Sequence, residues 1–214
     1  MEDILSHLRN DHSDFDKGNL IEIIGDKPFD LFEKWYAEAF QTKQPESNAF
    51  VLSTIGSEGF PSSRVLYLKE LLHQRLVFYT NYKSQKGQEL TKNSHASMLF
   101  FWPGLERQIR IEGICQKVTK DRSDAYFQSR PRSSQLGAWA SKQSEKLKSR
   151  RELEERMQEY AQIYTNEVPR PPHWGGYEMI PKRFEFWQGL PSRLHDRIVW
   201  ELTSNQWEIY RKNP

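Results

Sequence analysis

Residues Asn48–Lys69 read NAFVLSTIGSEGFPSSRVLYLK, two largely apolar runs separated by a short polar turn. The runs Asn48–Ile55 and Ser62–Lys69 are rich in aliphatic and aromatic residues, and Gly56 and Gly59 mark the turn between them. Two such runs around a glycine-containing turn are typical of a β-hairpin. The stretch therefore predicts that the domain is built on antiparallel β-sheet.

The second run carries one residue that does not suit a core. Because side chains alternate along a strand, Arg64 falls on the same face as Leu66 and Leu68. An unpaired buried cation is costly, so Arg64 requires an anionic partner. That partner is either a carboxylate of the protein or the phosphate of a ligand.

Further patterns of both kinds follow along the chain. Strand-like runs lie at Arg75–Thr80, His95–Trp102, Glu106–Lys117, Tyr177–Gln188, Arg193–Leu202 and Gln206–Lys212. Helical patterns lie at Pro28–Lys43, Ser84–Asn93, Thr119–Ser129 and Glu145–Glu167. Seven or eight strands joined mostly by tight turns predict a mainly β, α+β fold, an antiparallel barrel with flanking helices.

Length and composition indicate the number of domains and the cellular compartment. With 214 residues the chain can bury a full core, so we expect a single domain over residues 28–214 after a flexible, polar arm at residues 1–27. The one cysteine allows no intrachain disulfide, and the N-terminus resembles neither a signal peptide nor a membrane span. We therefore expect a cytoplasmic protein that binds no membrane.

Several common functions lack support in the sequence. A net charge of +2 is too small to argue for nucleic-acid binding. There is no GxGxxG, P-loop, CxxC or HExxH motif, so dinucleotide binding of the Rossmann type, nucleotide hydrolysis and the common zinc sites are not indicated. We expect no metal.

The stretch Arg130–Ser144, RPRSSQLGAWASKQS, combines three cations with four serines and two glutamines. Guanidinium groups, hydroxyls and amides are the donors that phosphate recognition uses. Ser133 or Ser134 is expected to cap a short helix through Trp139, and Ser141 or Ser144 the long helix after it. The alternative is a solvated basic loop between two helices.

Two other stretches have the composition of binding sites. Ser84 and Lys86 begin a helix entered directly from a strand, which is a favourable site for phosphate. In Glu185–Arg197, EFWQGLPSRLHDR, the side chains of Arg193, His195 and Arg197 would point the same way along a strand. Three such groups repel one another unless an anion or an electron-rich ring lies there; the alternative is a cationic ridge on an edge strand.

Together these strings resemble the pyridoxine (pyridoxamine) 5'-phosphate oxidase family. The resemblance rests on RPRSSQLGAWASKQS, EFWQGLPSRLHDR and RVLYLK, the last followed by Tyr79-Thr80-Asn81 and Ser84-Gln85-Lys86. These strings occur in the family's order and spacing. The resemblance extends from about Phe29 to Pro214. It implies an FMN-binding split barrel that forms a homodimer with its flavin sites at the subunit interface.

The resemblance also assigns roles to individual residues. The residues that match FMN contacts are Arg64, Val65, Leu66, Tyr67, Leu68, Lys69, Tyr79, Thr80, Gln85, Lys86, Gln108, Gln143, Ser144, Trp187 and Arg197. The residues that match substrate contacts are Arg9, Lys69, Tyr126, Arg130, Ser134, Arg193, Leu194 and His195. The catalytic cluster would be Arg193, His195 and Arg197. The chain departs from the family at Gln85, where an arginine is usual, and at His12, where a tyrosine is.

The implied activity is pyridoxal 5'-phosphate synthase. Hydride would pass from C4' of pyridoxine or pyridoxamine 5'-phosphate to the flavin, dioxygen would reoxidise the flavin to give hydrogen peroxide, and the amine substrate would also release ammonia. One alternative is another split-barrel flavin oxidase, of the phenazine-biosynthesis type. A second is a protein that binds FMN or pyridoxal phosphate without turnover.

Overall fold

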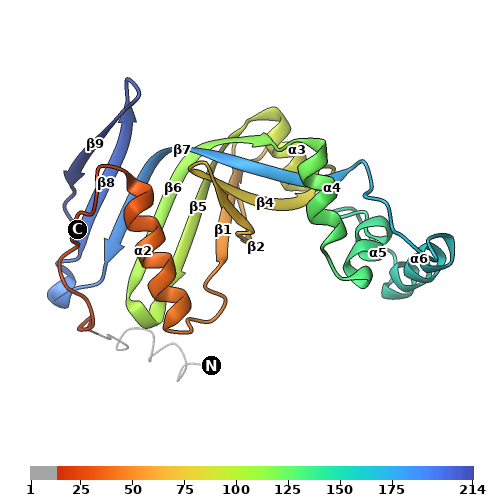
Figure 1. The fold of residues 1–214 in the computed structure, drawn as a ribbon, viewed down its shortest axis with the longest axis horizontal. Helices are drawn as coiled ribbons and strands as arrows, with labels where there is room; N and C mark the ends of the chain where they lie inside the picture. The colour runs from red at the N-terminus through yellow and green to blue at the C-terminus, as the bar shows by residue number, and fades with distance from the viewer. Residues whose placement is uncertain (1–13) are drawn as a thin grey trace. The chain divides into compact units, whose positions relative to one another are not determined.

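A computed structural model describes residues 14–214 of the chain (Figure 1). Its helices are α2 (Pro28–Gln41), α3 (Gln85–Lys92), α4 (Lys120–Gln128), α5 (Arg132–Ala140) and α6 (Arg150–Ile163). Its strands are β1 (Ala49–Ile55), β2 (Pro61–Tyr67), β3 (Glu70–Leu72), β4 (Arg75–Asn81), β5 (His95–Trp102), β6 (Arg107–Lys117), β7 (Trp174–Gln188), β8 (Asp196–Thr203) and β9 (Gln206–Arg211). Within this range no helix is long and apolar enough to cross a membrane.

The strands of the described residues pair in one nine-stranded sheet. Their order is β2-β1-β5-β6-β7-β4-β3, with β8 joined to β7 and β9 joined to β8. The pairs β1–β2, β3–β4, β4–β7, β7–β8 and β8–β9 are all antiparallel. The predicted antiparallel sheet with flanking helices is therefore confirmed, and only the three-residue strand β3 was not expected.

The chain divides into two compact units that both draw on β5, β6 and β7. Among the described residues, the first contains 14–47, Leu99–Ile111 and Arg183–Pro214. The second contains Asn48–Met98 and Glu112–Lys182. Each unit has its own group of buried apolar side chains, and the candidate site residues occur in both.

In the first unit, α2 supplies one wall of an aromatic core. Pro28 begins the helix, where its missing N–H costs nothing. The Phe32 ring meets Phe100 edge to face at 5.5 Å, and Trp35 meets Phe186 in the same way at 5.3 Å. The β8–β9 hairpin is visible in Figure 1, and its two-residue turn is formed by Ser204 and Asn205, whose φ angles are 51° and 64°.

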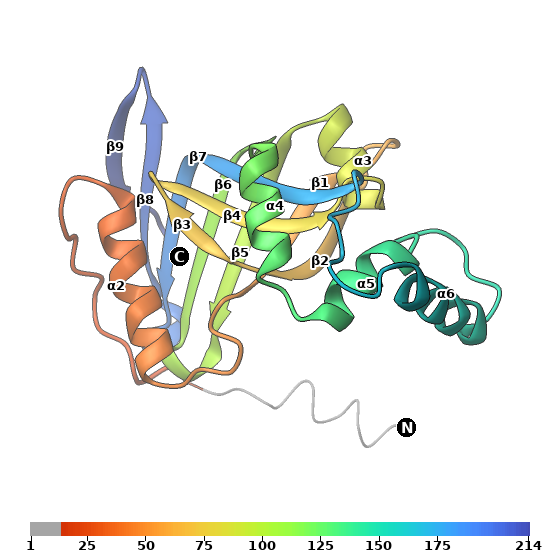
Figure 2. The same ribbon diagram turned by 45° about the vertical axis from the view of Figure 1, so that its right-hand side comes forward.

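In the second unit, the predicted hairpin of residues 48–69 is present. β1 and β2 pair from Ala49 opposite Tyr67 to Ile55 opposite Pro61. Helices α5 and α6 lie side by side in both views (Figures 1 and 2). Their inner faces contribute to a cluster built on buried side chains of α4, α5 and β7.

Two of the predicted helix starts are wrong. α5 begins at Arg132 after Pro131, which has no side-chain cap, so neither Ser133 nor Ser134 caps it. α6 begins only at Arg150, where the hydroxyl of Ser149 accepts a hydrogen bond from the Glu152 N–H. Neither Ser141 nor Ser144 caps α6, because Ser149 is followed three residues later by a glutamate, the pattern of a capping box.

Candidate functional site

A cavity of about 270 Å³ opens in the second unit at the end of β4 and the start of β7. It is lined by Asn81, Arg130, Ser134, Gly137, Ala138, Ser141, Gln143 and Trp174. The lining combines one guanidinium with hydroxyl and amide groups, the donor set of a site for an oxyanion. Arg130 and Ser134 were predicted to bind the substrate phosphate, and the structure places both of them on this cavity.

The guanidinium of Arg130 is the main charge of this cavity. It lies 4.4 Å from the ring centroid of Trp174 and 5.6 Å from that of Phe127. Its Nη1 atom is buried and has no hydrogen-bond partner among residues 14–214. Burial lowers the pKa of Arg130, partly offset by Tyr126. A buried cationic donor without an acceptor is costly, and an anion in the cavity would remove that cost.

Tyr126, also a predicted substrate residue, lies beside Arg130. Its ring stacks on the ring of Tyr79, with 3.8 Å between centroids and 8° between planes. Burial raises the pKa of Tyr126, although the charge of Arg130 opposes that effect. The hydroxyl therefore remains protonated near neutral pH and retains a hydrogen to donate.

The start of α3 holds a second cationic group. Ser84 caps the helix by accepting a hydrogen bond from the Gly87 N–H. Lys86 is buried, and its Nζ lies 3.3 Å from the Ser84 hydroxyl and 3.4 Å from the Gln143 side-chain oxygen. Burial, and then the charge of Arg64, lower the pKa of Lys86 to about 8. No carboxylate pairs with this ammonium group in the described part of the chain.

Arg64 has the carboxylate partner that the sequence left as one possibility. Its Nη2 lies 3.2 Å from Glu89 Oε2, and its Nη1 donates to Thr54 and to the Leu52 carbonyl. Burial alone raises the pKa of Glu89, but its hydrogen bonds with Thr54 and Gln85 and the charge of Arg64 outweigh burial and lower it. Gln85 therefore faces a carboxylate, to which its amide donates at 2.9 Å.

The remaining predicted cofactor residues of this unit lie on β2, between β2 and β3, on β4 and after α5. Val65 and Tyr67 are 60% and 41% exposed, whereas Leu68 is buried. Lys69 Nζ lies 5.2 Å from the Tyr67 ring. Thr80 is buried on β4, beside Tyr79. Leu66 and Ser144 complete this set, and Ser144 has a φ of 72°.

In the first unit, two aromatic rings pack against the half-buried ring of His195. Its ring lies 4.7 Å from Trp187 and 5.3 Å from Phe15, centroid to centroid. Its Nδ1 accepts a hydrogen bond from the Leu190 N–H, so the neutral ring carries its proton on Nε2. Burial and the nearby charge of Arg193 lower the pKa of His195.

Arg197 is fixed by a buried carboxylate. Its Nε and Nη2 donate to Glu185 Oε1 at 3.1 and 2.5 Å. Burial alone raises the pKa of Glu185, but hydrogen bonding from Arg197 and the charges of Arg110 and Arg197 outweigh burial and lower it. Glu185 is only 2% exposed, so it is a strong fixed anchor for Arg197.

The predicted alignment of Arg193, His195 and Arg197 along one strand is wrong. β8 begins at Asp196, and Arg193 lies in a turn that starts at Pro191. The proline has no N–H for a sheet ladder, and Arg193 has a φ of 59°, which no strand residue adopts. Arg197 therefore belongs to the sheet, whereas Arg193, the 69% exposed Leu194 and His195 belong to the loop before it.

Two further predicted residues are Gln108 and Arg9, and four residues without a predicted role belong to the groups described above. Gln108 is half-buried on β6, and Arg9 lies outside the described residues. No role was predicted for Asn81, Glu89, Trp174 or Glu185, although Asn81 and Glu185 lie within the quoted motifs. Of these, Glu89 had a usable signal, because it lies one helical turn after Gln85 and faces the same side.

Comparison with known proteins gives consistent matches. Residues 36–164 match the family model described as pyridoxamine 5'-phosphate oxidase, and residues 174–214 match the one described as the pyridoxine 5'-phosphate oxidase C-terminal dimerisation region. A pyridoxine/pyridoxamine 5'-phosphate oxidase from Synechocystis is 50% identical over 202 residues, covering 94% of each chain. Its counterpart from Nostoc is 47% identical over 217 residues, covering 100% of both chains.

Solved structures agree on the fold. PhzG from Burkholderia lata, in complex with tetrahydrophenazine-1-carboxylic acid, is 30% identical and superposes with a TM-score of 0.85, covering 92% of this chain and 100% of its own. A pyridoxamine 5'-phosphate oxidase-related, FMN-binding protein from Nostoc punctiforme is 16% identical, with a TM-score of 0.69 and coverage of 89% and 100%. The predicted split-barrel fold is confirmed.

Proposed function

The chain belongs to the pyridoxine/pyridoxamine 5'-phosphate oxidase family, and from that premise we propose that it oxidises pyridoxine 5'-phosphate or pyridoxamine 5'-phosphate to pyridoxal 5'-phosphate, with FMN as cofactor and dioxygen as final acceptor. The observation that carries the proposal is the buried Nη1 of Arg130, which has no partner among residues 14–214 and belongs to a cavity of about 270 Å³. A phosphate ester supplies the missing acceptor.

The residues at the start of α3 fit the phosphate of FMN. The buried ammonium group of Lys86 makes only long hydrogen bonds, to the Ser84 hydroxyl at 3.3 Å and to the Gln143 amide oxygen at 3.4 Å. Such a group is stabilised by an anion, and the helix N-terminus favours one as well. Arg64 would contribute its charge from β2 while Glu89 holds its side chain in place.

The chemistry supplied by bound FMN is acceptance of the hydride from C4' of the substrate, followed by reoxidation by dioxygen. The protein's own residues bind and orient. Arg130, Tyr126 and Ser134 hold the substrate phosphate. His195 carries its ring proton on Nε2, because its Nδ1 accepts a hydrogen bond from the Leu190 N–H, so Nε2–H would be its donor to the substrate. Arg197, held by Glu185, contributes a fixed positive charge toward the flavin.

We also propose that the protein is a homodimer. The match of residues 174–214 to a dimerisation region supports this assembly. Trp187, Arg193, His195 and Arg197 lie within that region, so the pairing of two chains would complete each active site. Sedimentation of the purified protein at micromolar concentration is expected to give the mass of two chains.

The phenazine-type alternative is the weaker one. PhzG is 30% identical to this chain, whereas the pyridoxine/pyridoxamine 5'-phosphate oxidases are 47% and 50% identical. The experiment is aerobic turnover of the FMN-reconstituted protein with pyridoxine 5'-phosphate, in which pyridoxal 5'-phosphate and hydrogen peroxide are measured together. Equal amounts of both support the oxidase. A flavin-containing protein that makes neither product from the alcohol or the amine would contradict the proposal and favour a non-catalytic binder.

A further inference from the structure

We propose that Glu70 and Arg122 are positioning residues for the substrate phosphate, acting through the ring of Tyr79 on Tyr126 and Arg130. The inference rests on the proposed function, because it takes Tyr126 and Arg130 as the groups that bind the phosphate. Neither Glu70 nor Arg122 was predicted to have a role, and neither belongs to the lining of the cavity.

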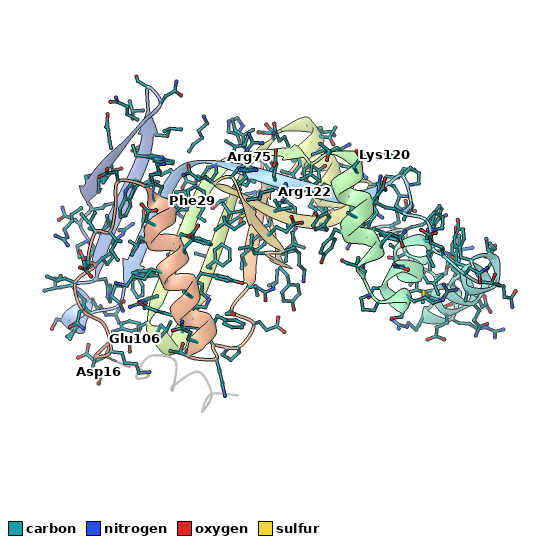
Figure 3. The ribbon with its side chains drawn as sticks, in the orientation of Figure 1. Asp16, Phe29, Arg75, Glu106, Lys120 and Arg122 are labelled. Atoms are coloured by element: carbon teal, nitrogen blue, oxygen red, sulfur yellow. The ribbon has the colours of Figure 1, made fainter. Side chains whose placement is uncertain are left out.

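The first contact is an ion pair between β3 and α4. Arg122 donates to Glu70 Oε2 through Nε at 3.1 Å and through Nη2 at 2.6 Å. The two side chains are 22% and 34% exposed, so solvent screens the pair only partly. Arg122, which is labelled in Figure 3, lies in the first turn of α4, because the helix starts at Lys120. The pair holds the short edge strand to a helix that is far away in the sequence.

The second contact joins this pair to Tyr79. The Tyr79 hydroxyl donates to the other carboxylate oxygen, Glu70 Oε1, at 2.5 Å. Burial, and then the hydrogen bond to Glu70, raise the pKa of Tyr79. The phenol therefore remains a donor across the working pH range, and Glu70 has both oxygens engaged by named partners.

The third contact is a stack of three rings. Tyr79 lies 3.8 Å from Tyr126, with their planes 8° apart. Trp174 is nearly parallel to both, at 5.7 Å from Tyr79 and 6.2 Å from Tyr126. Arg130 lies over the Trp174 ring at 4.4 Å. Fixing the Tyr79 ring therefore restricts both Tyr126 and Arg130.

The consequence is preorganisation of the phosphate site. A flexible arginine and tyrosine lose conformational freedom when they bind a phosphate, and that loss reduces affinity. In a ring stack that the Glu70–Arg122 pair holds at one end, Tyr126 and Arg130 have already lost this conformational freedom before the phosphate binds. The pair should thus affect the binding of a phosphate-bearing ligand and leave the hydride step unchanged, because it acts only on Tyr126 and Arg130, the groups that bind the phosphate.

The experiment compares Glu70→Ala, Arg122→Met and the double variant with the wild type, all saturated with FMN as judged from flavin absorbance. For each, KM and kcat are measured with pyridoxine 5'-phosphate, together with the inhibition constant of inorganic phosphate. We expect both single variants to raise KM and that inhibition constant about threefold to tenfold, with kcat within about twofold of wild type. KM and the phosphate inhibition constant of the double variant should be no higher than those of the more affected single variant, because both residues act through the Tyr79 ring.

Arg75→Met is the matched control. Arg75, which is labelled in Figure 3, lies on β4, the strand of Tyr79. It forms an ion pair with Glu178. Its removal also deletes an arginine–glutamate pair from this sheet, but it leaves the ring stack intact. KM and phosphate inhibition should remain at wild-type values. Arg122→Met provides the test if Glu70→Ala does not fold.

Three results would overturn the inference. One is an unchanged KM and phosphate inhibition constant in a folded Glu70 or Arg122 variant. Another is an equal rise in Arg75→Met, and the third is a fall of kcat with KM unaltered. If the wild type itself fails to oxidise pyridoxine 5'-phosphate, the proposed function is wrong; calorimetric titration of the same variants with inorganic phosphate then tests the positioning role by itself.

Discussion

The guanidinium of Arg130 lies 4.4 Å from the ring centroid of Trp174, and its Nη1 is buried without an acceptor among residues 14–214. The indole supports the cation through its face, which leaves the edge of the guanidinium for hydrogen bonds. Arg132, two residues along, differs in this respect, because it donates to the carbonyls of Asn166 and Tyr164 at the end of α6. Two neighbouring arginines of one motif thus differ, because Arg132 is held by backbone carbonyls, whereas Arg130 keeps a donor for the proposed phosphate.

FMN affinity is expected to weaken as the pH rises through about 8. The pKa of Lys86 is about 8 because the ammonium group is buried beside Arg64, so the lysine is charged at pH 7 and neutral at pH 9.5. A phosphate group keeps its double charge over that range, since its second pKa is about 6. Fluorescence titration of FMN should give an affinity that falls up to tenfold per pH unit above pH 8. Lys86→Arg should abolish this dependence; a dependence that survives in Lys86→Arg would mean that another group titrates.

The same lysine makes the folded protein more stable as the pH rises, whereas it makes FMN binding weaker. A base whose pKa is lowered on folding destabilises the native state at every pH where the unfolded chain would bind the proton. The penalty is present in full below pH 8 and disappears as the pH rises toward 10.5, the ordinary pKa of lysine. Bound phosphate relieves the penalty below pH 8, so the thermal stabilisation by FMN should be larger at pH 7 than at pH 9.5.

Gln85→Arg is expected to tighten FMN binding by about fivefold, since it adds a cation next to Lys86. Gln85 already donates to Ser62 at 3.2 Å and to Glu89 at 2.9 Å, so an arginine there would share the carboxylate that holds Arg64. The matched control is Gln88→Arg on the same helix, because Gln88 donates to the Lys83 carbonyl instead. Equal affinities of the two variants would show that only net charge matters at this site.

A core substitution tests the fold independently of function. Phe184 is fully buried and meets Phe29 at 5.1 Å and Trp207 at 5.9 Å, ring to ring. Phe184→Ala should cost about 3–5 kcal/mol of unfolding free energy in urea denaturation. Phe40→Ala is the control, since Phe40 is 70% exposed on α2 and should cost less than about 0.5 kcal/mol. Similar losses for both would contradict the described packing.

The parts of this fold that the sequence predicted are those encoded locally. The hairpin at 48–69 was recoverable because its alternation and its turn residues agree, and Ser84 was recoverable as a cap because a strand precedes it directly. The start of α6 was missed although a local signal was present, since Ser149 is followed three residues later by Glu152, whereas Ser141 and Ser144 have no glutamate at that spacing.

The candidate site likewise contains residues that a local motif identifies and residues that only the folded structure brings together. Arg130 and Ser134 line one cavity and could be singled out because one motif contains both; their substrate role stays a prediction. The loop geometry of Arg193 was missed because it depends on the positive φ angles of Ser192 and Arg193, which no periodicity encodes. The link from Arg122 to Glu70 joins residues 52 positions apart and depends wholly on how α4 packs on the sheet.

The central claim is that Arg130 selects substrates through their phosphate, and one comparison tests it most directly. kcat/KM is measured for pyridoxine 5'-phosphate and for unphosphorylated pyridoxine, with the wild type, Arg130→Met and the control Arg132→Met. A charge-assisted hydrogen bond contributes about 1.5–3 kcal/mol, so Arg130→Met should reduce the preference for the phosphorylated substrate by at least about tenfold. Arg132→Met should keep that preference. A preference that Arg130→Met leaves intact would contradict the account, because the phosphate would then be bound elsewhere.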